Sequence, residues 1–415
     1  MTVARSGTPT AEQMAAWLEA DRVARPQRLA RLRERMARAG VDAYFGVRRE
    51  NARYLTGLVL GEGEEKVAGQ SGWFLISRDE VVVFVDSRYR VQAHEECPEA
   101  RVEEVYHDLF QRWADLLASL RPVHGRGGGD GVGTGDRVSR LAAESGAVSH
   151  ATWNGLAGAE PNVELVPING WVEELRATKE PAEVERIAAA CAVADAALER
   201  LLPEVQVGVT EAELALRLEW EMRTHGAEAL AFDVACLSGP RAALPHGSPG
   251  SRGVAAGEVL LFDFGAQVAG YRSDMTRTLF VGEPDAESRL IYELVARAQQ
   301  AALDALAEAV AAGEHPSGPA IDAVARGVIT EAGYGGQFGH GLGHGIGLAT
   351  HEAPSLGRAA PDVPLPSPTV FSVEPGVYLD GRTGVRIEDL VLFDPPSRML
   401  ERLTSFPRGV TVVGE

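Results

Sequence analysis

An acidic residue interrupts an apolar stretch at Asp263, within residues 259–265 (VLLFDFG). A second acid, Asp274, lies eleven residues later and directly precedes another strand-like stretch, and the segment QVAG (267–270) between them can form a turn. A turn centred on the midpoint of this segment would place the two aspartates opposite each other in an antiparallel pair. Like charges at such positions, with Cβ atoms about 4.5–5.5 Å apart, are destabilising, but a cation bound between them would remove the repulsion.

The acidic pair does not by itself require a metal ion. One aspartate could cap a turn, or Arg272 or Arg277 could neutralise the pair. The hairpin alone does not decide between a turn cap, an ion pair with arginine and a metal site.

A second predicted hairpin repeats the arrangement. The strand-like stretch VFSVE ends in Glu374, an Asp-Gly pair at residues 380–381 is a strong turn signal, and the stretch GVRIE returns to Glu388. Pairing about Gly381 sets Glu374 against Glu388, since each lies seven residues from this glycine. Both hairpins therefore predict a pair of carboxylates.

Three histidines lie between or beside these hairpins. The glycine-rich segment 339–347 (GHGLGHGIG) contains His340 and His344, and His351 follows it. Glycine allows backbone and ligands to approach closely, so we expect this segment to contribute to the same site. His246, in the sequence LPHG, is a weaker candidate when it is considered alone.

The four carboxylates and one neutral imidazole would carry a charge of −4, which two divalent cations balance. Two metal ions about 3.5–4 Å apart hold a nucleophilic water and polarise a carbonyl group. An oxygen-rich ligand set with one nitrogen suits Mn, Co, Fe or Zn better than a thiolate site would. The residues themselves therefore predict a dinuclear metallohydrolase.

The composition is that of an ordinary globular protein, with 45% hydrophobic and 24% charged residues among 415. The 40 basic and 59 acidic residues give a net charge of −19, so the chain has no general attraction to nucleic acid or to an anionic membrane. Three widely spaced cysteines (Cys97, Cys191 and Cys236) indicate buried thiols in a reducing compartment. We find neither a signal peptide nor a membrane-length apolar run, and we expect a cytoplasmic protein.

The pattern of elements predicts two domains with a boundary near residues 165–178. Residues 20–168 alternate strand-like and helical stretches and are typical of an α/β domain. In the second half, helices are predicted over residues 178–202, 285–311 and 319–332. A capping box from Thr210 to Glu213 predicts one more helix, which ends near Gly226, and strands and turns dominate elsewhere.

The N-terminal half also contains two predicted helices and a glycine-rich segment. A capping box from Thr10 to Gln13 predicts the start of one helix, and a second, arginine-rich helix is predicted from Pro26 to Ala39. The glycine-rich segment 124–136 is interpreted as a flexible surface loop, because a phosphate-binding loop would require a following Lys-Ser/Thr pair.

At these motifs the sequence resembles the creatinase/prolidase group of metallopeptidases, which have the pita-bread fold and cleave Xaa-Pro bonds. The similar segments in the second half are SGPRAALPHG, DFG with GYRSDMTRT, HGLGHG, EPG and RIED. Those in the first half are RLR, YLTG and VDSRY, and the stretch from Trp171 to Ile187 matches the junction between the domains. The resemblance implies an α+β protein with a creatinase-like domain over residues 1–170, of which 1–20 are an unmatched extension, and a catalytic domain over residues 171–415.

The resemblance also implies which residues bind metal. The ligands would be Asp263, Asp274, His344, Glu374 and Glu388. Asp274 and Glu388 would bridge both ions, and Glu374 would also act as general base on the attacking water.

Four further residues would act on the substrate. By the same resemblance, His351 would stabilise the developing oxyanion or hold the proline end. His246 and His340 would line the substrate pocket, and Arg386 would support the ligands or bind a substrate carboxylate.

The leading hypothesis is an Xaa-Pro dipeptidase that acts on short proline-containing peptides with a free N-terminus. It would bind two divalent ions per chain, with manganese first and Co, Zn or Fe as alternatives, and it would form a homodimer, as this family often does. An aminopeptidase P that acts on longer Xaa-Pro peptides is the alternative. Another hydrolase or lyase of a small metabolite and a non-catalytic binding protein remain open, although the complete ligand set argues against both and against metal-free creatinase.

Overall fold

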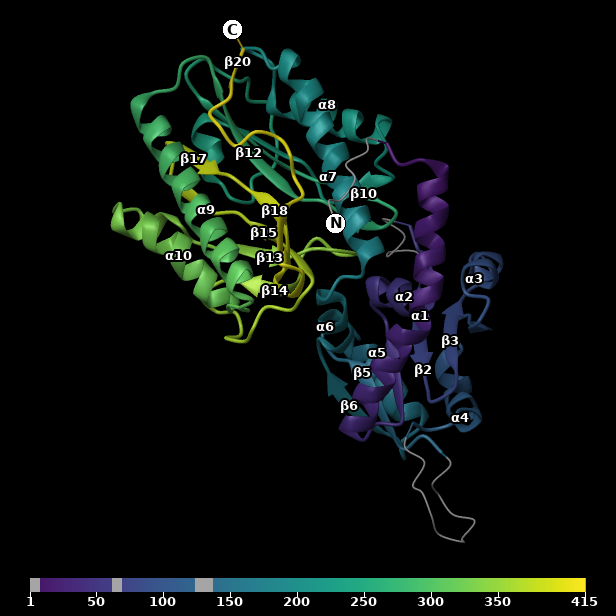
Figure 1. Cartoon of the computed structure of the whole chain (residues 1–415). Coiled ribbons are helices and arrows are strands. Elements are labelled where there is room, and N and C mark those ends of the chain that lie inside the picture. The colour runs from purple at the N-terminus through teal and green to yellow at the C-terminus, as the bar shows by residue number, and fades with distance from the viewer. Residues whose placement is uncertain (1–7, 62–68, 124–136, 415) are drawn as a thin grey trace. The chain divides into compact units, whose positions relative to one another are not determined.

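The computed structural model describes residues 8–61, 69–123 and 137–414 (Figure 1). The glycine-rich segment 124–136 and the beginning of the N-terminal extension lie outside these residues, so the interpretation of that segment as a surface loop stays a prediction.

The chain divides into two compact units. One consists of Leu18–Leu175, and the other consists of Met1–Trp17 together with Arg176–Glu415. The sequence placed the boundary at residues 170/171, and in the structure the division falls within the short helix α6 (Trp171–Ala177).

The unit Leu18–Leu175 is built on a six-stranded mixed sheet with the strand order β4-β3-β2-β1-β5-β6. Its strands are β1 (Ala43–Gly46), β2 (Phe74–Ile76), β3 (Val81–Val85), β4 (Arg101–Glu104), β5 (Arg140–Glu144) and β6 (Glu164–Ile168). Only β2 pairs antiparallel with its neighbours. The helices between the strands are α2 (Arg49–Thr56), α3 (Arg90–Glu96), α4 (Leu109–Ser119) and α5 (His150–Ala159). This is the α/β arrangement that the sequence predicts.

The N-terminal helix differs from the prediction. The capping box between Thr10 and Gln13 forms as expected, but α1 (Ala11–Ala39) is one continuous helix with Pro26 inside it. Proline normally breaks a helix because it cannot donate the backbone hydrogen bond. Here Arg28, two residues further on, is anchored by tertiary contacts: it donates to Tyr54 O at 3.1 Å and to Asp21 Oδ1 at 3.0 Å. Such contacts stabilise the helix across the proline.

The other unit contains two larger sheets, with the strand orders β20-β12-β9-β8 and β14-β13-β15-β18-β19, and two small ones, β11-β10-β7 and β16-β17. The strands of the first half are β7 (Ala229–Leu230), β8 (Ala235–Ser238), β9 (Val259–Phe264), β10 (Ala266–Val268), β11 (Tyr271–Arg272) and β12 (Met275–Val281). The remaining strands are β13 (Gly343–Gly345), β14 (Glu352–Leu356), β15 (Thr369–Val373), β16 (Gly376–Leu379), β17 (Thr383–Arg386), β18 (Asp389–Asp394), β19 (Met399–Arg402) and β20 (Val412–Val413).

Two pairs of helices pack against these sheets (Figure 1). The pairs are α7 (Pro181–Leu201) with α8 (Glu211–Thr224), and α9 (Ala286–Ala312) with α10 (Gly318–Glu331). Their bounds agree with the predicted helices, and the capping box at the start of α8, between Thr210 and Glu213, is present. Strand β9 separates the two hydrophobic cores, because Phe262 packs with α7 and α8 whereas Leu261 packs with α9 and α10.

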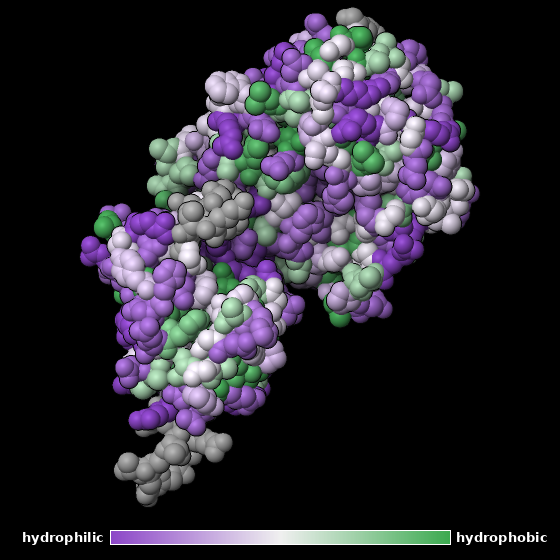
Figure 2. Space-filling model, turned by 180° about the vertical axis from the view of Figure 1, so that it is seen from behind, coloured by the Kyte–Doolittle hydropathy of each residue, from purple (hydrophilic) through white to green (hydrophobic). Residues whose placement is uncertain are grey.

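The face drawn in Figure 2 is largely hydrophilic, with apolar residues in small scattered groups. Among the described residues, no helix is both long enough and apolar enough to cross a membrane.

Candidate metal centre

The first acidic hairpin forms, but its register differs from the prediction. Strands β9 and β12 are antiparallel, and Asp263 lies opposite Thr276 rather than opposite Asp274. The turn is centred on Ala269 and Gly270, which have φ angles of 48° and 83°. A two-residue turn with positive φ at both positions suits the twist of a hairpin, but alanine rarely adopts a positive φ. The turn therefore lies one position later than the sequence predicts.

Asp274 nevertheless reaches the same site as Asp263. It lies two residues before Thr276, so its side chain points to the same face of the hairpin, in the diagonal position relative to Asp263. This face is the one on which Leu261 contacts the core of α9 and α10. The diagonal placement keeps the two carboxylates on one side of the sheet while avoiding a direct pairing.

The second acidic hairpin has the predicted register. Gly376 pairs with Arg386 at one end of the β16–β17 ladder, and Val373 pairs with Asp389 on the adjoining strands β15 and β18. The same register therefore runs on both sides of Glu374 and Glu388, which lie at the break between the two ladders. The chain ends its strands at these acids and leaves both carboxylates available for a ligand.

His344 enters the site from the short strand β13, between Gly343 and Gly345. A Cβ on Gly343 would lie 1.9 Å from Ser372 O, and one on Gly345 would lie 2.2 Å from Ala353 O. Only glycine allows the neighbouring strands to approach this closely. The two glycines thus allow β13 to fit between β14 and β15 with the imidazole aimed at the carboxylates.

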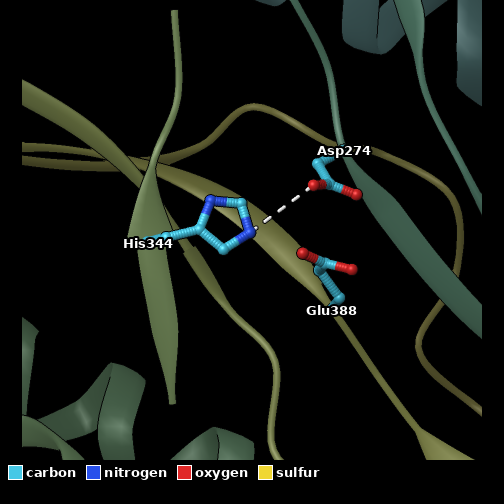
Figure 3. A group of neighbouring side chains, drawn as sticks. All are labelled: Asp274, His344 and Glu388. Atoms are coloured by element: carbon cyan, nitrogen blue, oxygen red, sulfur yellow. Dashed lines mark ion pairs between the residues drawn. The ribbon is translucent and has the colours of Figure 1, made fainter. Parts of the chain in front are cut away.

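The ligand atoms converge as a metal site requires (Figure 3). One ligand atom from each of Asp274, His344 and Glu388 lies within 4.8 Å of the others. His344 Nε2 lies 3.6 Å from Asp274 Oδ2 and 3.3 Å from Glu374 Oε1. The fifth predicted ligand, Asp263, affects the pKa of the other three acids, so all five predicted ligands belong to one cluster.

Two observations indicate that this cluster fits metal cations. First, Asp263 Oδ1 and Glu388 Oε1 are buried without a hydrogen-bond partner, and unsatisfied buried carboxylate oxygens are costly. Second, burial and the neighbouring carboxylates raise the pKa of Asp274 and of Glu388, and burial raises the pKa of Glu374 to about 7. A cation would satisfy the oxygen atoms and remove the repulsion.

Arg386 lies behind the acids. Its guanidinium donates to Asp263 Oδ2 at 2.6 Å, to Thr276 Oγ1 at 2.8 Å and to the Tyr378 hydroxyl at 2.9 Å. Thr276 in turn donates to Glu388 Oε2 at 2.7 Å. Arg386 therefore contacts one predicted ligand directly and a second one through Thr276, as the expected role of supporting the ligands requires.

The two arginines that the sequence offered as neutralising partners make contacts outside the first acidic pair. Arg277 pairs with Asp389 at 2.7 Å, and Arg272 donates to Ala231 O at 2.6 Å. Arg277 also donates to the backbone oxygen of Glu388. The arginine that pairs with the carboxylate of a predicted ligand, Asp263, is Arg386, which belongs to the second hairpin and therefore could not be found from the residues of the first.

The remaining predicted histidines differ in their surroundings. His340 is hydrogen-bonded through Nε2 to the Tyr378 hydroxyl at 2.9 Å, and burial lowers its pKa to about 4. The centroids of the His351 and His344 rings lie 4.1 Å apart. His246 is exposed, and its electrostatic interaction with both His340 and His351 places it on the same side of the site.

Sequence reasoning missed several supporting residues. Tyr378 links His340 to Arg386, and Ser372 donates to Glu374 Oε1 at 3.1 Å. Tyr378 and Ser372 both lie in the second hairpin, close to ligands, but hydroxyl groups of this kind carry no spacing signal of their own.

Family models match both halves of the chain. The model of the creatinase/prolidase N-terminal domain matches residues 28–178, and the model of metallopeptidase family M24 matches residues 185–395. The second match contains every residue of the acidic cluster.

Individual proteins agree with this match. An Xaa-Pro dipeptidase of Pyrococcus furiosus is 40% identical over 229 residues, which are 55% of this chain and 64% of that protein. Among solved structures, an Xaa-Pro dipeptidase from Bacillus anthracis has a TM-score of 0.80 and 31% identity, and the match covers 93% of this chain and 99% of that one. An X-Pro aminopeptidase from Thermotoga maritima has a TM-score of 0.76 and 33% identity, with the same coverage.

Proposed function

Because the chain belongs to metallopeptidase family M24, we propose that it is an Xaa-Pro dipeptidase that binds two divalent metal ions. The observation that carries this proposal is the convergence of Asp274, His344 and Glu388, with Glu374 beside His344. Buried oxygens of Asp263 and Glu388 have no hydrogen-bond partner. The similarity to the Bacillus anthracis dipeptidase over nearly the whole chain supports the choice of substrate.

The proposed ligands are the five residues of the cluster, with manganese as the first candidate metal. The ions would supply an activated water nucleophile and polarise the scissile carbonyl. Asp274 and Glu388, whose carboxylates converge with His344, are the residues that would bridge two ions, as the family resemblance implies. Arg386 and Thr276 hold Asp263 and Glu388 in place through the hydrogen bonds described above.

Glu374 is the proposed general base. Its Oε1 accepts a hydrogen bond from Ser372, which orients the carboxylate to take a proton from the attacking water. His351 would donate to the oxyanion that develops on the scissile carbonyl, and His246 and His340 would line the substrate pocket.

We attribute selectivity to the pocket, because two metal ions could activate attack on any amide. A penultimate proline has a rigid ring and no N–H. Alanine at that position would introduce an N–H that such a pocket leaves without an acceptor, and an unpaired buried donor costs about 1–3 kcal/mol. Ala-Pro should therefore be preferred over Ala-Ala by roughly 10–100-fold.

The test is to measure kcat/KM of the manganese-loaded protein for Ala-Pro, Ala-Ala, Ala-Pro-Ala and N-acetyl-Ala-Pro. We expect Ala-Pro to be the best substrate and the acetylated peptide to be a poor one. Comparable rates on Ala-Ala would refute selectivity for proline, and good turnover of the acetylated peptide would refute the requirement for a free amine.

A second candidate function is favoured by one comparison. The Thermotoga maritima structure is named an X-Pro aminopeptidase and is as similar to this chain as the dipeptidases are. A strong preference for Ala-Pro-Ala over Ala-Pro in the same assay would support an aminopeptidase instead. We further propose that the chain forms a homodimer, which light scattering on the purified protein would check.

A further inference from the structure

Three charged side chains form a buried cluster for which the proposed reaction gives no role. Glu352, at the start of β14, pairs with Arg176 and with Lys179, whose Nζ lies 3.1 Å from Glu352 Oε2. The side chains of Arg176, Lys179 and Glu352 are 4%, 1% and 2% exposed. Burial would by itself raise the pKa of Glu352, but the two cations lower this pKa to about 2, so Glu352 is an anion.

The carboxylate of Glu352 also holds a piece of backbone. Its Oε1 accepts a hydrogen bond from Ala349 N at 2.8 Å. A Cβ on Gly347 would lie 2.9 Å from the Glu352 carboxylate oxygens, so the backbone of residues 347–351 packs directly on this group. The ion cluster therefore fixes one side of the turn that precedes β14.

The other side of this turn is fixed by Arg272, from β11. Arg272 N donates to Gly347 O at 2.9 Å, and its guanidinium donates to Thr350 Oγ1 at 3.1 Å. The Thr350 hydroxyl in turn donates to Ala231 O at 3.1 Å. The turn is thus attached on one side to the buried Glu352 carboxylate and on the other to the partly buried Arg272.

His351 is carried by this turn and has little support of its own. Its side chain is exposed, and in the described part of the chain its ring makes no hydrogen bond. Yet the ring lies 4.1 Å from the ring of His344. Its position must therefore come from the backbone on either side, namely the turn before it and Glu352 after it.

We propose that Glu352, held by Arg176 and Lys179, is a positioning residue that fixes the turn of residues 347–351 and thereby holds His351 beside His344. This inference rests on the proposed function, in which His351 acts on the substrate carbonyl. A displacement of about 1 Å in such a group can lower a rate by roughly 10²-fold. Neutralising Glu352 should therefore lower kcat without removing metal ligands.

The kinetic test is a double-mutant cycle of Glu352→Gln with His351→Ala. We expect Glu352→Gln to lower kcat on Ala-Pro by roughly 10–100-fold with little change in KM. In the His351→Ala background the same change should alter kcat by less than about twofold, because the group on which it acts is already gone. Equal effects in both backgrounds would overturn the proposal.

The matched control is Asp195→Asn. Asp195 is another buried carboxylate of the same unit and accepts three hydrogen bonds, from Ser405 N, Ser405 Oγ and Phe406 N. This variant should lose stability but keep its kcat. If both variants lower kcat in proportion to lost stability, the role of Glu352 is only structural and the proposal is wrong.

A readout that does not depend on activity separates this inference from the proposed function. Hydrogen exchange of the backbone amides of residues 347–352 should accelerate at least about tenfold in Glu352→Gln, with unchanged exchange in α9. Lys179→Met leaves Arg176 and Glu352 as an ion pair with no net charge. This variant should fold well, and exchange of the same amides should accelerate by a smaller factor. Unchanged exchange in both variants would overturn the inference even if Ala-Pro is cleaved. Faster exchange in a protein that does not cleave Ala-Pro would instead refute only the proposed function.

Discussion

At the scale of single residues, the site is a set of acids that repel one another until a cation is present. Asp274 and Glu388 are almost fully buried, and Arg386 pairs with the proposed ligand Asp263. One arginine offsets only part of the charge of four carboxylates. The acids were recognisable in the sequence because each interrupts or ends an apolar strand, whereas a role for Arg386 was expected only from the resemblance.

Glu374 should make the metal-free protein sensitive to pH. Its pKa is raised to about 7 in the folded protein, from 4.5, so the folded state binds the proton more tightly than the unfolded state does. The stability of the metal-free parent relative to Glu374→Gln should therefore fall as the pH rises from about 4.5 to 7, by on the order of 2–3 kcal/mol. The measurement is chemical denaturation of both proteins in chelator across this range.

The comparison with Glu374→Gln is needed because burial lowers the pKa of His340 and His344, and these groups give stability an opposite trend. Saturating manganese should abolish the pH-dependent difference. A difference that stays constant from about pH 4.5 to 8 in chelator would contradict the raised pKa.

The histidines should separate by role when each is replaced. His344→Ala removes a proposed ligand and should lower the metal content of the purified protein. His351→Ala should keep its metal yet lose about 10²–10³-fold in kcat, which is the usual effect of removing one donor to an oxyanion. Metal analysis and kinetics on the same samples check this, and equal metal loss in both variants would show that the division is wrong.

At the scale of elements, hairpin geometry decides which acids meet. The second hairpin was predicted correctly because Asp380-Gly381 leaves little choice of turn, and Gly381 has the positive φ of 71° that the turn requires. The register of the first hairpin was predicted one position away from the observed one, because its turn uses Ala269 and alanine rarely adopts a positive φ. The long-range contacts of Glu352 could not be predicted at all, since its partners lie more than 170 residues away.

Gly270→Ala should weaken the first hairpin. With φ at 83°, a Cβ at this position costs roughly 1–2 kcal/mol, and the turn sets the register that brings Asp263 and Asp274 together. We expect a loss of stability of this size together with weaker metal binding, measured by denaturation and by calorimetric titration.

Gly327→Ala in α10 is the control, because a Cβ there meets open space and alanine favours the helix. It should stabilise the protein by up to about 1 kcal/mol and leave metal binding unchanged. A Gly270→Ala protein as stable as the parent would show that the turn does not control the register.

At the scale of the whole molecule, all the proposed ligands and substrate-binding residues come from the unit that contains Arg176–Glu415. Its two helix pairs and the strands of its two acidic hairpins could be predicted from periodicity, turn signals and caps, as could the α/β character of the other unit. The continuous helix α1 could not, because local sequence rules end a helix at Pro26 and only the tertiary contacts of Arg28 override them.

The central claim is that two metal ions, bound by this acidic cluster, support hydrolysis of Xaa-Pro dipeptides. The most direct measurement is a titration of the metal-free protein with Mn²⁺, in which bound metal and Ala-Pro hydrolysis are followed together. We expect no hydrolysis in chelator and activity that saturates when two ions are bound per chain. Full activity in a purified protein without bound metal, or saturation of binding and activity at a single ion, would contradict the claim.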